Sequence, residues 1–184
     1  MHQGNWVINV SSSDVKSRDG SAPNVHYHGS GSLKNIALDQ VAALMNDAWI
    51  SGAADGTFDW DGAGNSFRAL LAGSKGQVQF VIKNGGLTHV TIPGISGPLP
   101  VHRFAGELEL NHNVWKLSEG RLESRDGIYQ VSGTASAASG FDCVLKRADE
   151  RSWNLTGTLS KPRVASIEQT EAKRTETEAK TLKP

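Results

Sequence analysis

Two histidines come nearest to a chemical site in this sequence by type and spacing. His26 and His28 are two residues apart in a run that alternates between apolar and polar side chains, so both imidazoles are expected on one side of a strand. Imidazole nitrogens at this spacing can hold a metal ion, but a zinc site needs at least three protein ligands. The sequence identifies no third ligand, and we expect a solvated strand face without a metal.

A second candidate is the segment 59–65, Asp-Trp-Asp-Gly-Ala-Gly-Asn, which resembles the oxygen-rich loop of a calcium site. Such a loop closes with an acidic ligand at a fixed distance along the chain. Ala72 and Gly73 stand where that glutamate is needed. The segment is therefore predicted to be a strand end, a turn and a helix start, with no calcium bound.

The motifs of common enzymes are missing. The sequence has no Gly-x-Ser-x-Gly elbow, no Walker loop and no Rossmann glycine fingerprint. Glu107 and Glu109 alternate onto a polar strand face, where nothing prepares a carboxyl group for acid catalysis. Cys143 lies between Phe141 and Leu145 in an alternating run, a pattern typical of a small core residue. We expect no enzymatic activity and no cofactor.

Composition excludes further classes of protein. The 184 residues carry nineteen basic and nineteen acidic side chains, so the formal net charge is zero. A nucleic-acid binder or a polybasic membrane-surface binder would need an excess of Lys and Arg, and neither is expected. No run of eighteen apolar residues predicts a transmembrane helix, and residues 1–10 lack the pattern of a signal peptide. The sequence is thus expected in the cytosol, or as a segment of a longer protein with its anchor upstream.

Alternation of apolar and polar residues with a period of two dominates the chain and predicts half-buried strands. Each strand would have one polar face in water and one apolar face shielded from it, which we call the dry face. Val78, Phe80 and Ile82, for example, alternate with Gln77 and Gln79. We expect the dry faces to join into one apolar surface. Its predicted lining residues are Phe58, Trp60, Val78, Phe80, Ile82, Phe104, Leu108, Leu110, Phe141, Leu145, Trp153 and Leu155.

Turn residues and a charged tail set the expected boundaries. Asn84-Gly85-Gly86 predicts a hairpin turn because Asn and Gly tolerate positive φ, and residues 93–100 predict a proline-rich loop. Residues 165–184 contain almost no large apolar side chain, so they cannot offset their ordering entropy. We therefore predict one β-rich domain over residues 1–164 and a disordered or frayed polar tail over 165–184.

Two short helices are predicted between the strands. Residues 38–45 have apolar side chains at helical spacing, with Asn35 as a candidate N-cap. Residues 67–71 form a second stripe, which Asn65 can cap and Gly73 can end. Helices this short depend on packing against the sheet.

Residues 29–162 resemble the C-terminal region of the AsmA-like family. The most telling stretch is 65–87, in which a short helix with paired leucines leads to a glycine, a strand and a polar-glycine turn. The helix over 38–46 and the strand over 56–62 look like the preceding elements, and residues 155–162 look like the closing strand and proline. Members of this family usually begin with a membrane anchor, so the resemblance predicts one upstream.

The resemblance, which extends to TamB-like and YhdP-like relatives, implies a periplasmic protein held at the inner membrane in its full-length form. Family members are viewed as long β-grooves linked to outer-membrane assembly and to phospholipid movement between membranes. The implied partners are phospholipid acyl chains and other envelope proteins, and no catalytic residue is implied. Acyl chains need such a path because each methylene exposed to water costs about 0.8 kcal/mol.

The predicted fold class is mostly β: a curved antiparallel sheet, open as a groove or closed as a sandwich, with two short helices. A lipid-lined groove and a packed core use the same residue types, so both remain open at this point. The alternative function is a closed β-sandwich that assembles with envelope partners without binding lipid.

Overall fold

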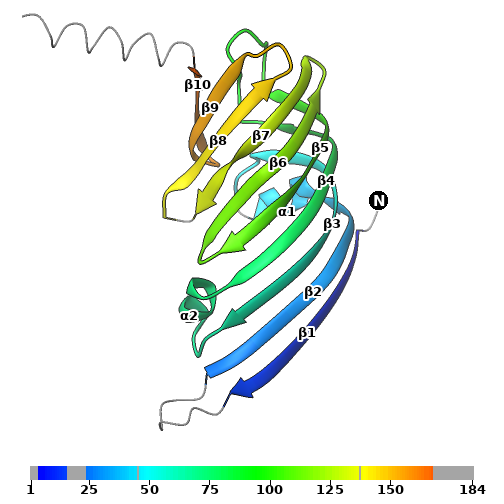
Figure 1. Cartoon of the computed structure of the whole chain (residues 1–184). Coiled ribbons are helices and arrows are strands. Elements are labelled where there is room, and N and C mark those ends of the chain that lie inside the picture. The colour runs from blue at the N-terminus through cyan, green and yellow to red at the C-terminus, as the bar shows by residue number, and fades with distance from the viewer. Residues whose placement is uncertain (1–3, 16–23, 45, 137, 168–184) are drawn as a thin grey trace, which may run out of the picture.

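The computed structural model describes residues 4–15, 24–44, 46–136 and 138–167. Ten antiparallel strands pair in chain order, each with the next, in one curved sheet whose edges are β1 and β10 (Figure 1). The strands are β1 (Asn5–Val15), β2 (Asn24–Ala37), β3 (Ile50–Ala63), β4 (Lys75–Leu87), β5 (Leu99–Asn111), β6 (Val114–Ser124), β7 (Gly127–Ser136), β8 (Gly140–Arg147), β9 (Ser152–Thr158) and β10 (Lys161–Ser166). Helix α1 (Leu38–Leu44) connects β2 to β3, and α2 (Phe67–Ala72) connects β3 to β4.

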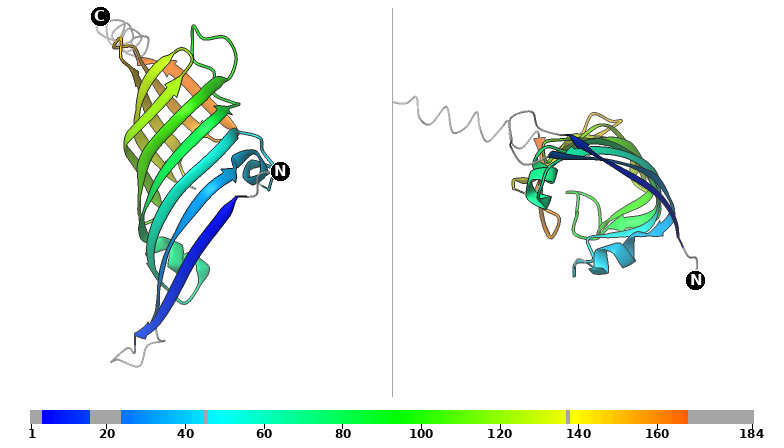
Figure 2. Two further views of the ribbon diagram at one scale, coloured as in Figure 1. Left: turned by 90° about the vertical axis from the view of Figure 1, so that its right-hand side faces the viewer. Right: turned by 90° about the horizontal axis from the view of Figure 1, so that it is seen from below.

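The predicted mostly β fold with a curved antiparallel sheet is confirmed, and its form is open. Seen from below, the strands bend around a trough, and the sheet does not form the two stacked layers of a sandwich (Figure 2). All ten strands of the described residues belong to this one sheet.

The register places apolar residues on a common face. Directly paired residues of antiparallel strands point to the same side of a sheet. One such row crosses six strands through Ile8, Gly31, Phe58, Val78, Leu108 and Leu117. A second row runs through Val10, Gly29, Trp60, Gly76, Leu110 and Trp115. Both rows contain only apolar residues and glycine, so the dry face is continuous from β1 to β6.

The main core fills one end of the trough. The loop 88–98, between β4 and β5, contributes Val90 and Ile92 to the buried cluster that also contains Leu122 and Tyr129. The loop is held to the sheet because the Leu99 backbone N–H donates to the Val90 carbonyl at 2.9 Å. The other buried members of this cluster are Leu99, Val101, Leu117, Val131, Leu145, Trp153 and Leu155. None of them comes from β1, β2 or β3 within the described residues.

The predicted hairpin turn at Asn84-Gly85-Gly86 is wrong. These residues lie inside β4, and Gly85 and Gly86 still pair with Val101 and Pro100 of β5. Asn84 does adopt the positive φ (52°) expected for a turn. Here it accompanies a break in the register between β3 and β4, inside the long strand β4. The chain reverses later, in the loop 88–98 that supplies part of the core.

Two predicted helix caps are also wrong. Asn35 lies in β2, where its backbone N–H donates to the Asp55 carboxylate at 2.8 Å, and α1 begins only at Leu38. The cap of α2 is Ser66 instead of Asn65, because the Ser66 Oγ accepts from the Ala69 backbone N–H at 3.2 Å. The predicted end of α2 is confirmed, since Gly73 follows its last residue.

The predicted tail begins inside the last strand. Ala165 and Ser166 pair with β9 as part of β10, so the expected boundary at residue 164 falls within an ordered element. Residues 168–184, which make up most of the predicted tail, lie outside the described residues.

Candidate functional site

The apolar side chains of β1 lie uncovered on the inner face of the sheet. Trp6 is 63% exposed and Val10 is 69% exposed, and Ile8 between them is also exposed. Their neighbours on the inner face, Phe58 and Trp60 of β3, are only half-buried. A contiguous apolar surface in water is typical of a site that takes a ligand or a partner.

Glycines beside the aromatic rings shape this face. A Cβ built at Gly31 would stand 2.8 Å from Cε1 of Phe58, and one at Gly106 would stand 3.3 Å from Cζ of Phe80. The rings therefore lie close over neighbouring backbone where no side chain projects. The result is a face made of rings and bare backbone, without tall side chains between them.

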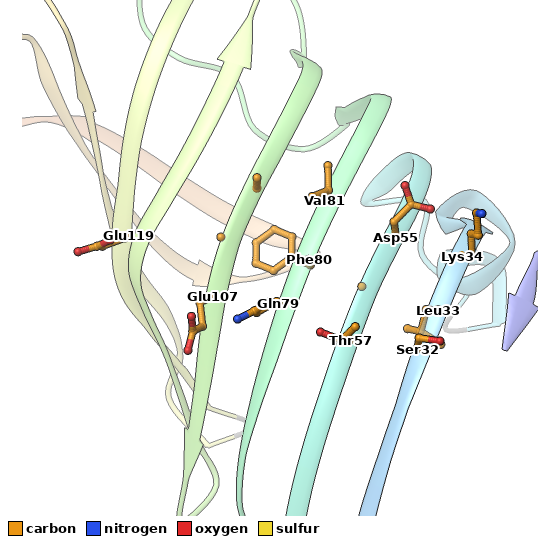
Figure 3. Close-up of a pocket in the computed structure, with 13 residues that line it drawn as sticks. Ser32, Leu33, Lys34, Asp55, Thr57, Gln79, Phe80, Val81, Glu107 and Glu119 are labelled. Carbon is orange, nitrogen blue, oxygen red and sulfur yellow. The ribbon is translucent and has the colours of Figure 1, made fainter. Parts of the chain in front are cut away.

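A hollow of about 670 Å³ lies over β2, β3, β4 and β5 (Figure 3). Among the predicted lining residues only Phe80 borders it, together with Leu33 and with the glycines at 56 and 106. Polar side chains from alternate positions, including Gln79 and Glu107, border it as well. Because its lining is mixed, this hollow is not the apolar groove that the sequence predicts.

Four predicted lining residues are closed core. Leu110, Leu145 and Leu155 are buried, and Trp153 is 3% exposed. Leu145, Trp153 and Leu155 belong to the main cluster, to which the loop 88–98 also contributes. The expected open lining is therefore corrected at these four positions, where the side chains stabilise the fold.

The remaining predicted lining residues divide into two groups. Phe58, Trp60 and Val78 lie outside the main core and remain half-buried on the open face. The partly buried residues that pack against the margin of the core are Phe80, Ile82, Phe104, Leu108 and Phe141. The prediction left out Trp6, Ile8 and Val10 of β1, although their alternation in the sequence is clear.

The pairing of β2 with β3 brings two carboxylates to His28. The Nδ1 atom of His28 lies 3.1 Å from Oδ1 of Asp61, and its Nε2 atom lies 3.7 Å from Oδ2 of Asp59. The three groups lie within 4.8 Å of one another, and all are exposed. Asp59 and Asp61 stand on a strand rather than in a calcium loop. The register supplied partners for His28 that sequence spacing alone could not identify.

Cys143 packs against the core, as the alternation predicts. Burial, followed by the charge of Asp142, raises the pKa of the Cys143 thiol above its ordinary value of 9.0. A thiol that stays protonated at neutral pH is a poor nucleophile. Its surroundings therefore favour a packing role.

A carboxylate ties the far end of the sheet to the segment after α1. Asp47 accepts a hydrogen bond from the Ser160 side chain in the β9–β10 turn, and its Oδ1 atom lies 2.8 Å from Nε2 of His89. These two hydrogen bonds, in that order of size, lower the pKa of Asp47 below its ordinary value of 3.8. The turn at Ser160 and the loop at His89 thus meet at one side chain, and this contact helps to hold the curvature of the trough.

Neither described helix is long and apolar enough to cross a membrane. Comparisons of the chain with protein-family models, with curated proteins and with solved structures find no match. The resemblance to the AsmA-like family stays a prediction, and the chain is assigned to no family.

Proposed function

We propose that this chain is a non-enzymatic segment of the bacterial cell envelope whose open apolar face carries phospholipid acyl chains between the inner and outer membranes, in support of outer-membrane assembly. The observation that supports this function is the continuous dry face. Rows of apolar residues and glycine cross from Ile8 and Val10 to β6, and they lie outside the main core over β1, β2 and β3, where the side chains of Ile8 and Val10 are exposed.

The physical basis is the removal of two apolar surfaces from water at once. Each methylene of an acyl chain that is covered contributes about 0.8 kcal/mol. The exposed side chains of Trp6, Ile8 and Val10 gain in the same way when an acyl chain covers them. A curved sheet surrounds a chain on several sides, so the gain is larger than on a flat face. Such contacts are non-directional, and no single residue is essential for them.

The ends of the trough differ, which suggests where a chain would lie. Ile92 and Leu99 are fully buried where the loop 88–98 closes the C-terminal half. The strands β1, β2 and β3 contribute no residue to that core, and although α1 and α2 contact β3, Trp6, Ile8 and Val10 stay exposed. We therefore propose that acyl chains settle on the open face over β1, β2 and β3 and extend toward the margin of the core at Phe80 and Leu108.

The proposed place in the cell rests on the resemblance of residues 65–87 to the AsmA-like family. On that basis the chain acts in the periplasm, with a membrane anchor elsewhere in the full-length protein. Its other partners would be envelope proteins.

Photocrosslinking at two positions of β4 tests the lipid proposal. A photoreactive amino acid at Phe80 faces the trough, whereas one at Gln77, an exposed residue of the other face that does not border the hollow, serves as the matched control. We expect lipid adducts at Phe80 and few at Gln77, with phospholipid in the solvent extract of the purified protein by mass spectrometry. Equal labelling at both positions, or no phospholipid and no adduct, would contradict the proposal.

Paired substitutions give a second test. Ile8→Asp combined with Phe58→Asp places charges on the open face of β1 and β3, and Val7→Asp combined with Gln77→Asp places them on the other face of the sheet, on β1 and β4. We expect the first pair to abolish phospholipid recovery and the second pair to leave it unchanged, both with wild-type circular dichroism.

Assembly without lipid is the second candidate function, and the free edge of the sheet favours it. Only β2 pairs with β1 in the described sheet, so the outer edge of β1 presents backbone groups to a partner strand. A complex with an envelope protein that survives Phe58→Asp, from protein that yields no phospholipid, would support this function over the first.

A further inference from the structure

The outer edge of β1 lacks the features that keep sheet edges apart. Residues 5–13 contain no charged side chain and no proline, and the pairing of β1 with β2 runs without a bulge over the whole strand. Trp6, Val7, Ile8 and Val10 are all exposed. A long, neutral, apolar edge strand readily pairs with another strand through its free N–H and C=O groups.

The opposite edge is protected. β10 begins with Lys161, Pro162 and Arg163, so it carries two positive charges and a residue that cannot donate a backbone hydrogen bond. Charged residues and proline at an edge oppose strand addition. The two edges of the described sheet thus differ in sequence, and β1 is the edge without this protection.

We propose that β1 is a homodimerisation strand, which pairs antiparallel with β1 of a second copy about a two-fold axis at Ile8. In this register Ile8 stands opposite Ile8, and Trp6 stands opposite Val10 of the second copy. On the other face Val7 stands opposite Asn9, and Asn5 stands opposite Ser11.

The sequence of the strand favours a second copy as the occupant. Trp6 and Val10 are spaced evenly about Ile8, so one register matches all the inner-face apolar residues of both strands. A two-fold contact of this kind uses the same patch on both copies and closes the assembly at two. No charge on residues 5–13 opposes the approach of an identical strand.

The dimer goes beyond the proposed lipid function and does not depend on it. In the paired sheet Trp6, Ile8 and Val10 would meet their counterparts, and the two dry faces would join across the two-fold axis. Twenty strands would then form one sheet whose outer edges are the two protected β10 strands.

The experiment is sedimentation analysis of the whole chain over a range of concentrations. We expect a monomer–dimer equilibrium for the wild type. Ile8→Lys places two like charges directly opposite each other, and we expect the dimer dissociation constant to rise by about tenfold or more. Val114→Lys is the matched control, because Val114 is an exposed valine far from β1 in the strand order, and it should dimerise like the wild type.

Crosslinking tests the register. In a Cys143→Ser background, Ile8→Cys should form a covalent dimer with a short thiol-specific crosslinker, whereas Ser13→Cys should not, because residues beyond Ser11 have no partner within β1. A wild type that is monomeric at every concentration would overturn the proposal. A dimer that survives Ile8→Lys but is lost in Phe58→Asp would overturn it as well, since the faces rather than the edges would then be in contact.

Discussion

Phe58 of β3 lies against Gly31 of β2, so closely that a Cβ on Gly31 would stand 2.8 Å from Cε1 of the phenyl ring. The same Cβ would also overlap the backbone oxygen of Val7 in β1. Gly31 therefore lets β1, β2 and β3 approach closely on the open face. Its lack of a side chain is a structural requirement of that face.

Gly31→Ala should destabilise the protein by about 1–3 kcal/mol, the usual range for overpacking, because backbone cannot give way cheaply. Gly29→Ala is the matched control on the same strand, since its nearest atom, in the Trp60 ring, would lie 3.6 Å away in ordinary contact. Urea unfolding followed by circular dichroism measures both variants. Equal loss of stability in the two would show that the close approach at Gly31 is not what matters.

The loop 88–98 should behave as part of the core. Ile92 is 1% exposed within the main cluster, so Ile92→Ala removes buried contacts and should lower the free energy of unfolding by about 2–5 kcal/mol. Leu44→Ala, at a side chain that is 86% exposed, should change it by less than about 0.5 kcal/mol. Thermal and urea unfolding of the two variants make the comparison, and a small effect at Ile92 would mean that the loop is not needed to close the trough.

The strands could be predicted from the sequence because burial repeats every two residues in this sheet. The alternation at Phe58 and Trp60, and at Val78 and Phe80, identifies both the strands and their dry face. One face of each strand is exposed to solvent and carries polar residues, so the two-residue period can be recognised in the sequence of a single strand, without knowledge of its neighbour.

The open and closed parts of that face could not be distinguished in the same way. Trp153 and Trp60 have similar apolar surroundings in the sequence, yet Trp153 is buried in the cluster to which the loop 88–98 contributes, and Trp60 is half-exposed. The difference depends on the side of the sheet to which a distant loop folds. The partners of His28 were hidden for a related reason, since the register of β2 and β3 joins residues more than thirty positions apart.

Cys143 should react slowly in the folded protein. Burial, and then the charge of Asp142, raise the pKa of its thiol above 9.0, so little thiolate forms at neutral pH. Labelling by a disulfide reagent should be much slower than in urea and should accelerate with rising pH. Because the folded state holds this proton more tightly, the associated stability is present below the unfolded pKa and is lost at higher pH. An introduced cysteine at exposed Ser13 is the control, and equal rates at the two positions would contradict the packing of Cys143.

Asp47 should make the curvature of the sheet sensitive to acid. Hydrogen bonds from Ser160 and then from His89 lower its folded pKa below the ordinary 3.8, so its contribution to stability is present above that value and is lost as the pH falls through the folded pKa. Asp47→Asn should therefore unfold at lower urea than the wild type at neutral pH. The two midpoints should converge in acid, where the wild-type carboxyl group is protonated.

Ser160→Ala tests the hydrogen bond from Ser160 to Asp47 independently of the one from His89. It removes the donor in the β9–β10 turn and leaves the contact of Asp47 with His89 in place. We expect faster amide hydrogen exchange in β9 and β10 in this variant, with little change in β1 and β2, because the turn at Ser160 loses its tie to the segment after α1. If Asp47→Asn follows the wild-type pH profile, or if exchange rises equally across the sheet, then Asp47 does not hold the two ends of the trough together.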